Sequence, residues 1–254
     1  MPINKGLLRE DEMIVNLNNK KVSELSINLR NLVEALFGAL LDDEVITCER
    51  MEGSMKPDFA ITYQGETKYV SMKSGRSDTL HCEYIKPFIL FLRELGISNR
   101  TQKTILLFHY GDGTMDGSGT TRMDYEDLCM WLKDRIKDAN EELNSDYNFI
   151  NKVIDRCIFD GASKEAISAD IIYHGDYQEG FHMNKKQAHK YVKNRKFTWA
   201  KKLHIGPMFL RPQGRYIGRE VKSEKKRHSI EVYWPHFKDS IDYVSRNYDS
   251  YVRR

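Results

Sequence analysis

The sequence predicts a mixed α/β fold in which helices flank a mixed central sheet. A long amphipathic helical pattern comes first, three short extended runs follow it, and helical and extended patterns then alternate along the chain. At 254 residues, of which 40% are hydrophobic, the chain is long enough to bury a sizeable core. No repeat or low-complexity linker interrupts it, so we expect one domain over residues 1–254.

The first element is an amphipathic helix over about residues 22–41. Its apolar residues recur at three- and four-residue spacing, which places them on one helix face: Val22, Leu25, Leu29, Leu32, Val33, Leu36, Phe37, Leu40 and Leu41. Three extended runs follow, at about residues 45–50, 58–63 and 68–73. The pattern therefore predicts a helix followed by a three-stranded meander.

Gln64-Gly65 separates the second and third runs and is typical of a two-residue hairpin loop. With this loop, Tyr63 faces Glu66, and the pairing continues until Asp58 lies opposite Ser71. Because side chains alternate along a strand, Tyr69, Ser71 and Lys73 share one face. A carboxylate and an ammonium group are therefore expected in one small patch.

The next segment predicts a helix through Ile85, Phe88, Ile89, Leu92 and Leu95, ending at Gly96, and then a buried strand at residues 104–110. The core order is thus α-β-β-β-α-β over residues 22–110. The remaining segments predict helices at 125–143, 149–159, 185–193 and 237–248, and strands at 169–173, 203–210 and 229–234. We expect the glycine-rich segment 111–121 to be a mobile surface loop.

Composition excludes several classes of protein. No apolar run is long enough to cross a membrane, and residues 1–11 lack the apolar region of a signal peptide, so a cytoplasmic location is expected. The four cysteines lie more than 25 residues apart and form no CxxC zinc motif. No phosphate-binding glycine motif is present, and we expect no small-molecule cofactor.

Charge is distributed unevenly along the chain. Residues 185–228 contain 15 Lys and Arg against Glu220 and Glu224, which gives +13 and leaves −10 elsewhere. A segment with this charge favours a polyanionic partner. We therefore expect a basic C-terminal part, about residues 180–235, that binds DNA phosphates, with these candidate residues: Arg211, Arg215, Arg219, Lys225, Lys226 and Arg227.

Pro57-Asp58, followed by Ser71-Met72-Lys73 in the predicted α-β-β-β-α-β order, resembles the PD-(D/E)xK nuclease superfamily, which has a restriction-endonuclease-like core. The resemblance covers residues 22–110. It implies a metal-dependent endonuclease, with Asp58 as a metal ligand and Lys73 acting on the attacking water. It also implies Mg²⁺, with Mn²⁺ as a substitute, and duplex DNA as the substrate.

This chain has Ser71 where the family usually has a second acidic residue. A subgroup of restriction enzymes is similar in having S-x-K on the strand and a glutamate on the following helix, which implies Glu83 as the second metal ligand. Glu34, on the first helix, matches the family's helix-borne acidic residue. The same subgroup places Arg-Ser-Asp after its lysine, which implies that Arg76 and Asp78 read base edges.

The expected function is therefore Mg²⁺-dependent, restriction-like cleavage of duplex DNA by Glu34, Asp58, Ser71, Lys73 and Glu83, in a homodimer if both strands are cut symmetrically. Two alternatives remain open. One is a repair, recombination or mobile-element nuclease of the same fold, which would recognise DNA structure. The other is a DNA-binding protein that is inactive because of Ser71.

Overall fold

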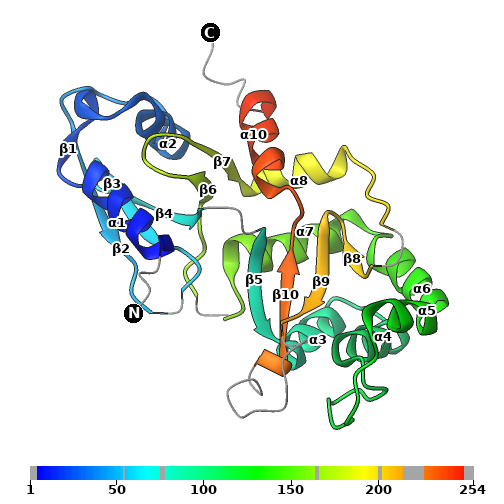
Figure 1. The fold of residues 1–254 in the computed structure, drawn as a ribbon. Helices are drawn as coiled ribbons and strands as arrows, with labels where there is room; N and C mark the ends of the chain where they lie inside the picture. Colours follow the sequence, from blue (N-terminus) through cyan, green and yellow to red (C-terminus); the bar gives the residue numbers. More distant parts are fainter. Residues whose placement is uncertain are drawn as a thin grey trace. The chain divides into compact units, whose positions relative to one another are not determined.

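The computed structural model describes residues 5–53, 55–74, 78–163, 166–199, 202–213 and 226–248. The chain divides into two compact units (Figure 1). Unit 1 comprises Met1–Asp78, Ile158–Tyr191 and His236–Arg254, and unit 2 comprises Thr79–Cys157 and Val192–Pro235. The segment predicted as the catalytic core, residues 22–110, therefore contributes to both units.

Unit 1 contains a six-stranded mixed sheet with the strand order β1-β2-β3-β4-β6-β7. Strands β2, β3 and β4 form an antiparallel meander, β6 pairs in parallel with β4, and β7 is antiparallel to β6. The predicted mixed sheet is thus confirmed. The strands are β1 (Lys20–Lys21), β2 (Val45–Arg50), β3 (Phe59–Tyr63), β4 (Glu66–Lys73), β6 (Ile171–Gly175) and β7 (Gly180–Asn184).

Helices α1 (Lys5–Leu17) and α2 (Ile27–Phe37) contribute apolar side chains to the core of this sheet. Ser26 caps α2 by accepting a hydrogen bond from the backbone N–H of Leu29, and α2 ends at Gly38. The core includes Met13, Leu17, Leu29, Leu32, Val33, Ile46, Phe59, Ile61, Val70, Met72 and Ile171. At about 25 cal/mol per Å² of apolar surface, this burial is the main force that holds the helices on the sheet.

The β3–β4 hairpin has the predicted register. Tyr63 pairs with Glu66 and Phe59 pairs with Val70. Gln64 and Gly65 both have positive φ, 50° and 80°, as a two-residue type I′ turn requires. Beyond the last pair, the backbone N–H of Asp58 donates to the carbonyl of Val70, at 2.8 Å, so Asp58 and Phe59 share Val70 as their partner. The confirmed pairing ends at Phe59–Val70, and the predicted Asp58–Ser71 pair is not part of this ladder; the two residues instead meet through their side chains, at 3.4 Å.

Unit 2 contains a four-stranded antiparallel sheet with the order β5-β10-β9-β8. Helix α3 packs against β5 and β10, and α4 packs against β9 and α6. The strands are β5 (Thr79–Tyr84), β8 (His204–Ile205), β9 (Met208–Pro212) and β10 (Ser229–Tyr233). The helices are α3 (Ile85–Glu94), α4 (Asn99–Tyr110), α5 (Tyr125–Trp131), α6 (Lys133–Leu143) and α7 (Tyr147–Ile154).

Two further helices and a π-helical turn lie in the described part of the chain. The turn, Asp155–Asp160, follows α7 directly. Helix α8 spans Lys185–Lys193, and α10 spans Phe237–Tyr248 and packs against β7. In the described part of the chain, no helix is both long and apolar enough to cross a membrane.

The strand predicted at residues 104–110 is wrong, because this segment is the second half of helix α4. Ser98 caps that helix and Gly111 ends it in the left-handed conformation, with φ of 63°. All of residues 104–110 except Leu106 are buried, and a segment buried on all sides has no amphipathic period that could distinguish a helix from a strand. The fourth strand of the predicted core order is instead β6, which pairs with β4 in parallel.

Other differences are smaller. Residues 203–210, predicted as one strand, contain two short strands joined by a turn at Gly206, and residues 125–143 form two helices that meet at Leu132. Helix α1 and strand β7 were not predicted. The prediction also missed β5, so the helix expected to carry Glu83 begins only at Ile85.

Candidate active site

Asp58, which directly precedes β3, contacts Ser71 near the end of β4, and Lys73 is the last residue of that strand. One carboxylate oxygen of Asp58 accepts a hydrogen bond from the backbone N–H of Met72, at 2.5 Å, and from the Ser71 hydroxyl, at 3.4 Å. Ser71 is fully buried, whereas Asp58 and Lys73 are half-buried. Ser71 therefore orients the carboxylate from within the sheet, and the other Asp58 oxygen takes no hydrogen bond from the described residues.

A second carboxylate near this patch comes from Glu10 on helix α1, which the sequence reasoning missed. Glu10 accepts a hydrogen bond from Arg50 at 2.7 Å, and its side chain is 16% exposed. Burial raises the pKa of Glu10, the Arg50 hydrogen bond opposes this effect, the charge of Asp58 raises the pKa further and the charge of Lys73 lowers it. Glu10 is thus within the electrostatic reach of both predicted catalytic residues.

Glu34 lies on α2, as predicted, but its contacts are local. Its carboxylate accepts a hydrogen bond at 3.3 Å from Arg30, one helical turn before it. Arg30 also pairs with Asp42, at 2.9 Å. This is an ordinary i,i+4 ion pair on a helix surface. A role for Glu34 at the metal stays a prediction, and Glu10 has the better-supported position for the helix-borne acid.

Glu83 does not occupy the place on which its prediction depended. It lies in strand β5, not at the start of a helix, and its side chain is 6% exposed. One oxygen is 3.0 Å from His81 Nε2 and 2.9 Å from Arg156 Nε, and the other is 2.7 Å from Arg156 Nη2. Burial raises the pKa of Glu83, but the hydrogen bonds and charges of His81 and Arg156 outweigh it and the pKa is lowered. Both oxygens are engaged within unit 2.

Of the two predicted base-reading residues, Arg76 and Asp78, the structure describes Asp78. Asp78 accepts hydrogen bonds from the backbone N–H groups of His236, at 3.1 Å, and Phe237, at 3.3 Å, and so caps helix α10. This contact occupies both of its carboxylate oxygens. Several other predicted DNA-binding residues lie outside the described residues: Arg76, Arg215, Arg219 and Lys225.

The three remaining DNA-binding candidates differ in exposure. Lys226 is exposed, and the side chain of Arg211 is 50% exposed. Arg227 is buried and forms an ion pair with Asp112 at 2.9 Å. Its guanidinium group therefore holds the protein's own loop, and this contact accounts for Arg227 without a phosphate.

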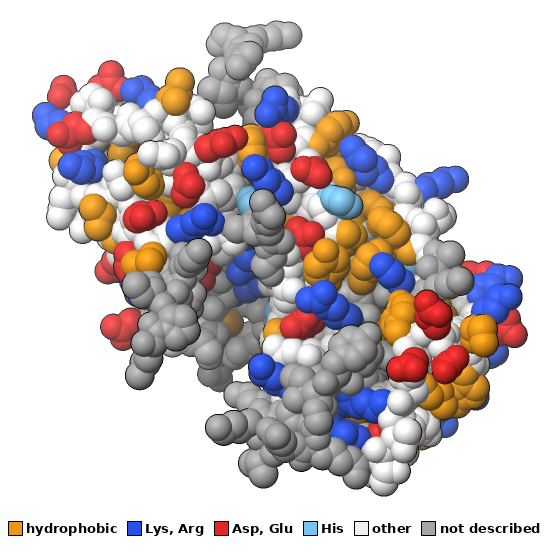
Figure 2. Space-filling view, in the orientation of Figure 1, with side chains coloured by type: hydrophobic (Ala, Val, Ile, Leu, Met, Phe, Trp, Pro, Cys, Tyr) orange, Lys and Arg blue, Asp and Glu red, His pale blue; other side chains and the backbone are white. Residues whose placement is uncertain are grey.

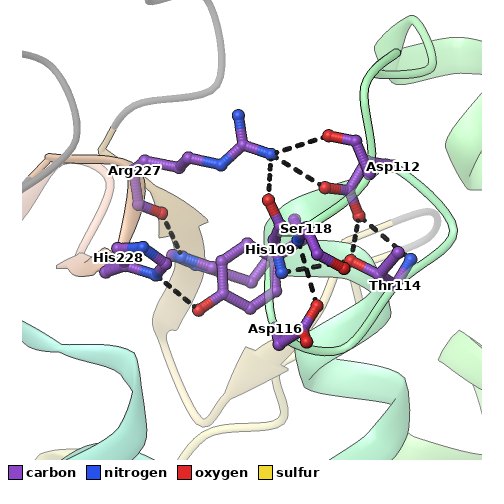
Figure 3. Close-up of polar contacts among 10 residues, drawn as sticks. His109, Asp112, Thr114, Asp116, Ser118, Arg227 and His228 are labelled. Carbon is purple, nitrogen blue, oxygen red and sulfur yellow. Dashed lines mark hydrogen bonds and ion pairs between the residues drawn. The ribbon is translucent and has the colours of Figure 1, made fainter. Parts of the chain in front are cut away.

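That loop is the glycine-rich segment 111–121 (Figure 3). Arg227 donates from Nη2 to the carbonyl groups of Gly117 and Gly119, and the Asp112 carboxylate accepts from the backbone and hydroxyl of Thr114. The expected mobile loop thus has a buried ion pair and several internal hydrogen bonds. The Asp112–Arg227 pair was not evident from the sequence, because 115 residues separate its members.

Comparison with solved structures shows a structural likeness to a known protein. No family model and no curated protein matches the chain. The chain is similar in structure to the restriction endonuclease MspI, solved in complex with its cognate DNA. The TM-score is 0.47 and the sequence identity is 13%, and the match covers 91% of this chain and 93% of that chain.

The residues around Asp58 are compatible with a divalent cation. Among the described residues, no three His, Cys, Asp or Glu side chains form a ready metal cluster. Mg²⁺ keeps most of its waters and commonly takes only one or two protein carboxylates. One Asp58 oxygen takes no hydrogen bond from the described residues, and a bound cation would relieve the repulsion between Asp58 and Glu10.

Proposed function

We propose that the chain is a Mg²⁺-dependent endonuclease that hydrolyses phosphodiester bonds in duplex DNA. The observation that carries this proposal is that Ser71 and the Met72 backbone hold Asp58 against β4, the strand that ends at Lys73, and that the charges of Asp58 and Lys73 both act on Glu10. We further propose that the activity is restriction-like and that two copies act together when both strands are cut. Mn²⁺ is expected to substitute for Mg²⁺.

Each residue has a distinct role in this proposal. Asp58, and Glu10 in place of Glu34 and Glu83, would hold the cation, which supplies an activated water and neutralises charge on the phosphate. The Lys73 ammonium donates hydrogen bonds to the attacking oxygen and to the phosphate as negative charge develops there. Ser71 fixes the rotamer of Asp58 from its buried position. Arg50 positions Glu10.

The test is conversion of supercoiled plasmid to nicked and linear forms. Cleavage is expected with Mg²⁺ or Mn²⁺ and not with chelator, and Asp58→Asn should abolish it while leaving DNA binding in the presence of Ca²⁺ largely intact. Discrete fragments from long DNA would support the restriction-like activity over a structure-specific one. Cleavage by Asp58→Asn at the parent rate would contradict the proposed site.

Ser71 and Glu83 favour a second candidate, a DNA-binding protein without nuclease activity. The usual second acid of the motif is a buried serine here, and the glutamate proposed to replace it is engaged by Arg156 and His81. On this alternative the protein would bind DNA with strong salt dependence but would leave plasmid intact at every Mg²⁺ and Mn²⁺ concentration. The plasmid test therefore separates the two candidates.

A further inference from the structure

The sheet of unit 2 presents two different faces. Met208 and Leu210 of β9 and Ile230 and Val232 of β10 are buried, and they alternate with Phe209, Arg211, Glu231 and Tyr233. Because the strands are paired with Arg211 opposite Glu231 and Phe209 opposite Tyr233, the second set shares one face. Helices α3 and α4 pack against these strands, and we infer that they cover the face with the buried apolar side chains.

Aromatic rings and cations alternate on the other face. Phe209 stacks with Tyr233, with ring centroids 6.3 Å apart, and Trp199 meets Phe209 edge-on at 4.8 Å. The Lys202 ammonium lies 4.5 Å from the centre of the Phe209 ring, and the Arg211 guanidinium lies 4.7 Å from that of Tyr233. We call these five residues, Trp199, Lys202, Phe209, Arg211 and Tyr233, the cation–aromatic face.

Arg211 is held in place more firmly than an ordinary surface arginine. Its Nε donates to Glu231 at 2.6 Å and its Nη2 donates to Thr79 at 3.1 Å, while the guanidinium rests on the Tyr233 ring. The side chain is nevertheless 50% exposed, and Nη1 donates to no described residue. Holding a half-exposed cation at three points lowers the entropy that it would lose on binding a ligand.

The sequence around this face indicates the charge of its partner. Residues 192–213 contain six Lys and Arg and no Asp or Glu: Lys193, Arg195, Lys196, Lys201, Lys202 and Arg211. Figure 2 shows hydrophobic and Lys or Arg side chains next to one another in the region where Figure 1 places β8 and β9. The face thus presents the exposed cations Lys202 and Arg211 beside the partly exposed rings of Trp199 and Tyr233, with Phe209 buried between them and Glu231 paired to Arg211. Exposed cations next to exposed rings, in a segment of net charge +6 over residues 192–213, match a nucleic acid backbone.

We propose that the cation–aromatic face of unit 2 binds the sugar–phosphate backbone of DNA, with Lys202 and Arg211 on phosphates and Trp199 against a sugar or an adjacent base. This inference rests on the proposed function, since DNA is the proposed substrate. It adds to that function a defined DNA-binding surface. Arg211 acts there as a fixed phosphate contact, and Trp199, Lys202 and Tyr233 are also assigned to DNA binding. An acidic protein segment is the competing occupant.

The first experiment measures DNA affinity against salt concentration in Ca²⁺, without cleavage. Lys202→Met with Arg211→Met should reduce the slope of log K against log salt by about 2, because each phosphate contact contributes roughly 0.9. The matched control is Lys133→Met with Lys137→Met, which removes the same charge from α6 of the same unit. The control should keep the parent slope. A thermal melt of each variant establishes that it is folded.

The second experiment uses the tryptophan itself and removes no charge. DNA should quench the fluorescence of Trp199, so Trp199→Phe should lose most of the quenching, whereas Trp131→Phe, on α5, should keep it. Trp131 is a suitable control because it is also exposed, at 49% against 36% for Trp199. Equal quenching in the two variants would contradict the assignment of Trp199.

The outcomes separate this inference from the proposed function. If the parent protein shows no salt-dependent DNA binding, the proposed function fails and this inference fails with it. If it binds DNA and both double variants have the same slope, only the cation–aromatic face is wrong. Displacement by polyglutamate as effectively as by DNA, at equal charge, would assign the face to acidic protein segments and overturn the proposal.

Discussion

Glu10 and Glu83 carry the same group, yet their surroundings move the two pKa values in opposite directions. Both are buried, which raises the pKa of a carboxyl group. Around Glu83, hydrogen bonds from His81 and Arg156 outweigh burial. Around Glu10, the single Arg50 hydrogen bond does not, and the charge of Asp58 adds to the increase. The two glutamates therefore make different contributions, Glu83 to stability and Glu10 to the proposed cation site.

Replacing Glu83 with Gln should destabilise the protein in a pH-dependent way. Because the folded pKa is below the ordinary 4.5, the carboxylate stabilises the fold fully above about pH 4.5 and loses this contribution as the pH falls through the folded pKa. We expect a loss of about 1–3 kcal/mol in the free energy of unfolding at pH 7. The difference from the parent should shrink towards pH 3.5, as measured by urea unfolding. A pH-independent difference would contradict the ion-pair assignment.

Glu10→Gln should weaken Mg²⁺ or Mn²⁺ binding by about tenfold or more, within the range seen when groups around a metal site are removed. The matched control is Asp11→Asn, which removes the neighbouring acid that also pairs with Arg50 but is 60% exposed. Titration calorimetry with each metal measures the effect. Since the pKa of Glu10 is raised, affinity in the parent should start to fall at a higher pH than an ordinary glutamate would give. Equal affinities for the two variants would remove Glu10 from the site.

At the scale of elements, the hairpin could be predicted because its information is local. Gln64-Gly65 sets the turn, the turn sets the register, and the register places Asp58 beside Ser71. Strands β2 and β4 and helices α8 and α10 were predictable for the same reason. Helix α4 could not be predicted, because a segment whose residues are buried on all sides shows no hydrophobic periodicity.

The site residues that were missed depend on distant segments. Glu10 is 40 residues from Arg50, the residue that holds it, and the Glu83–Arg156 pair spans 73 residues. Residue pairs that are this far apart in the sequence form no spacing motif that a single sequence would reveal. Strand β5 has too little regular alternation to be distinguished from the start of the following helix, and this is why Glu83 was placed on a helix.

The loop 111–121 offers a test of its packing with two glycines of similar backbone conformation. Gly113 and Gly117 have φ of 80° and 78°, so alanine at either position pays the same left-handed strain, roughly 1–2 kcal/mol. A Cβ at Gly117 would lie 2.7 Å from the buried Tyr110 ring, whereas one at Gly113 would meet nothing.

We therefore expect Gly117→Ala to destabilise unit 2 by at least about 1 kcal/mol more than Gly113→Ala, because the Tyr110 ring is held by a 2.8 Å hydrogen bond to His228 and cannot move away freely. Hydrogen exchange of residues 111–119 and thermal unfolding measure the difference. Equal effects of the two substitutions would show that the loop does not pack tightly against Tyr110.

For the whole molecule, the sequence predicted the mixed α/β class but not its division into two compact units. Unit 2 is formed by residues that lie between β4 and β6 of the unit 1 sheet, together with a segment before α10. The helices and strands of unit 2 can be predicted from a single sequence. The sheet to which each strand belongs cannot, because that depends on contacts between distant segments. The pairing of β5 with β10 joins residues that are 145 to 154 positions apart, and such long-range pairing is determined by tertiary packing.

The central claim is that Lys73, beside Asp58, acts in metal-dependent DNA cleavage. Lys68 is its control, because it lies on the same strand and pairs with Glu66 at 2.7 Å. The measurement is the single-turnover rate of plasmid cleavage at saturating Mg²⁺ for Lys73→Met and Lys68→Met. We predict a fall of at least about 100-fold for Lys73→Met, the size expected for loss of a group acting on the proton or charge of the transition state, and the parent rate for Lys68→Met. Cleavage by Lys73→Met at the parent rate would contradict the account.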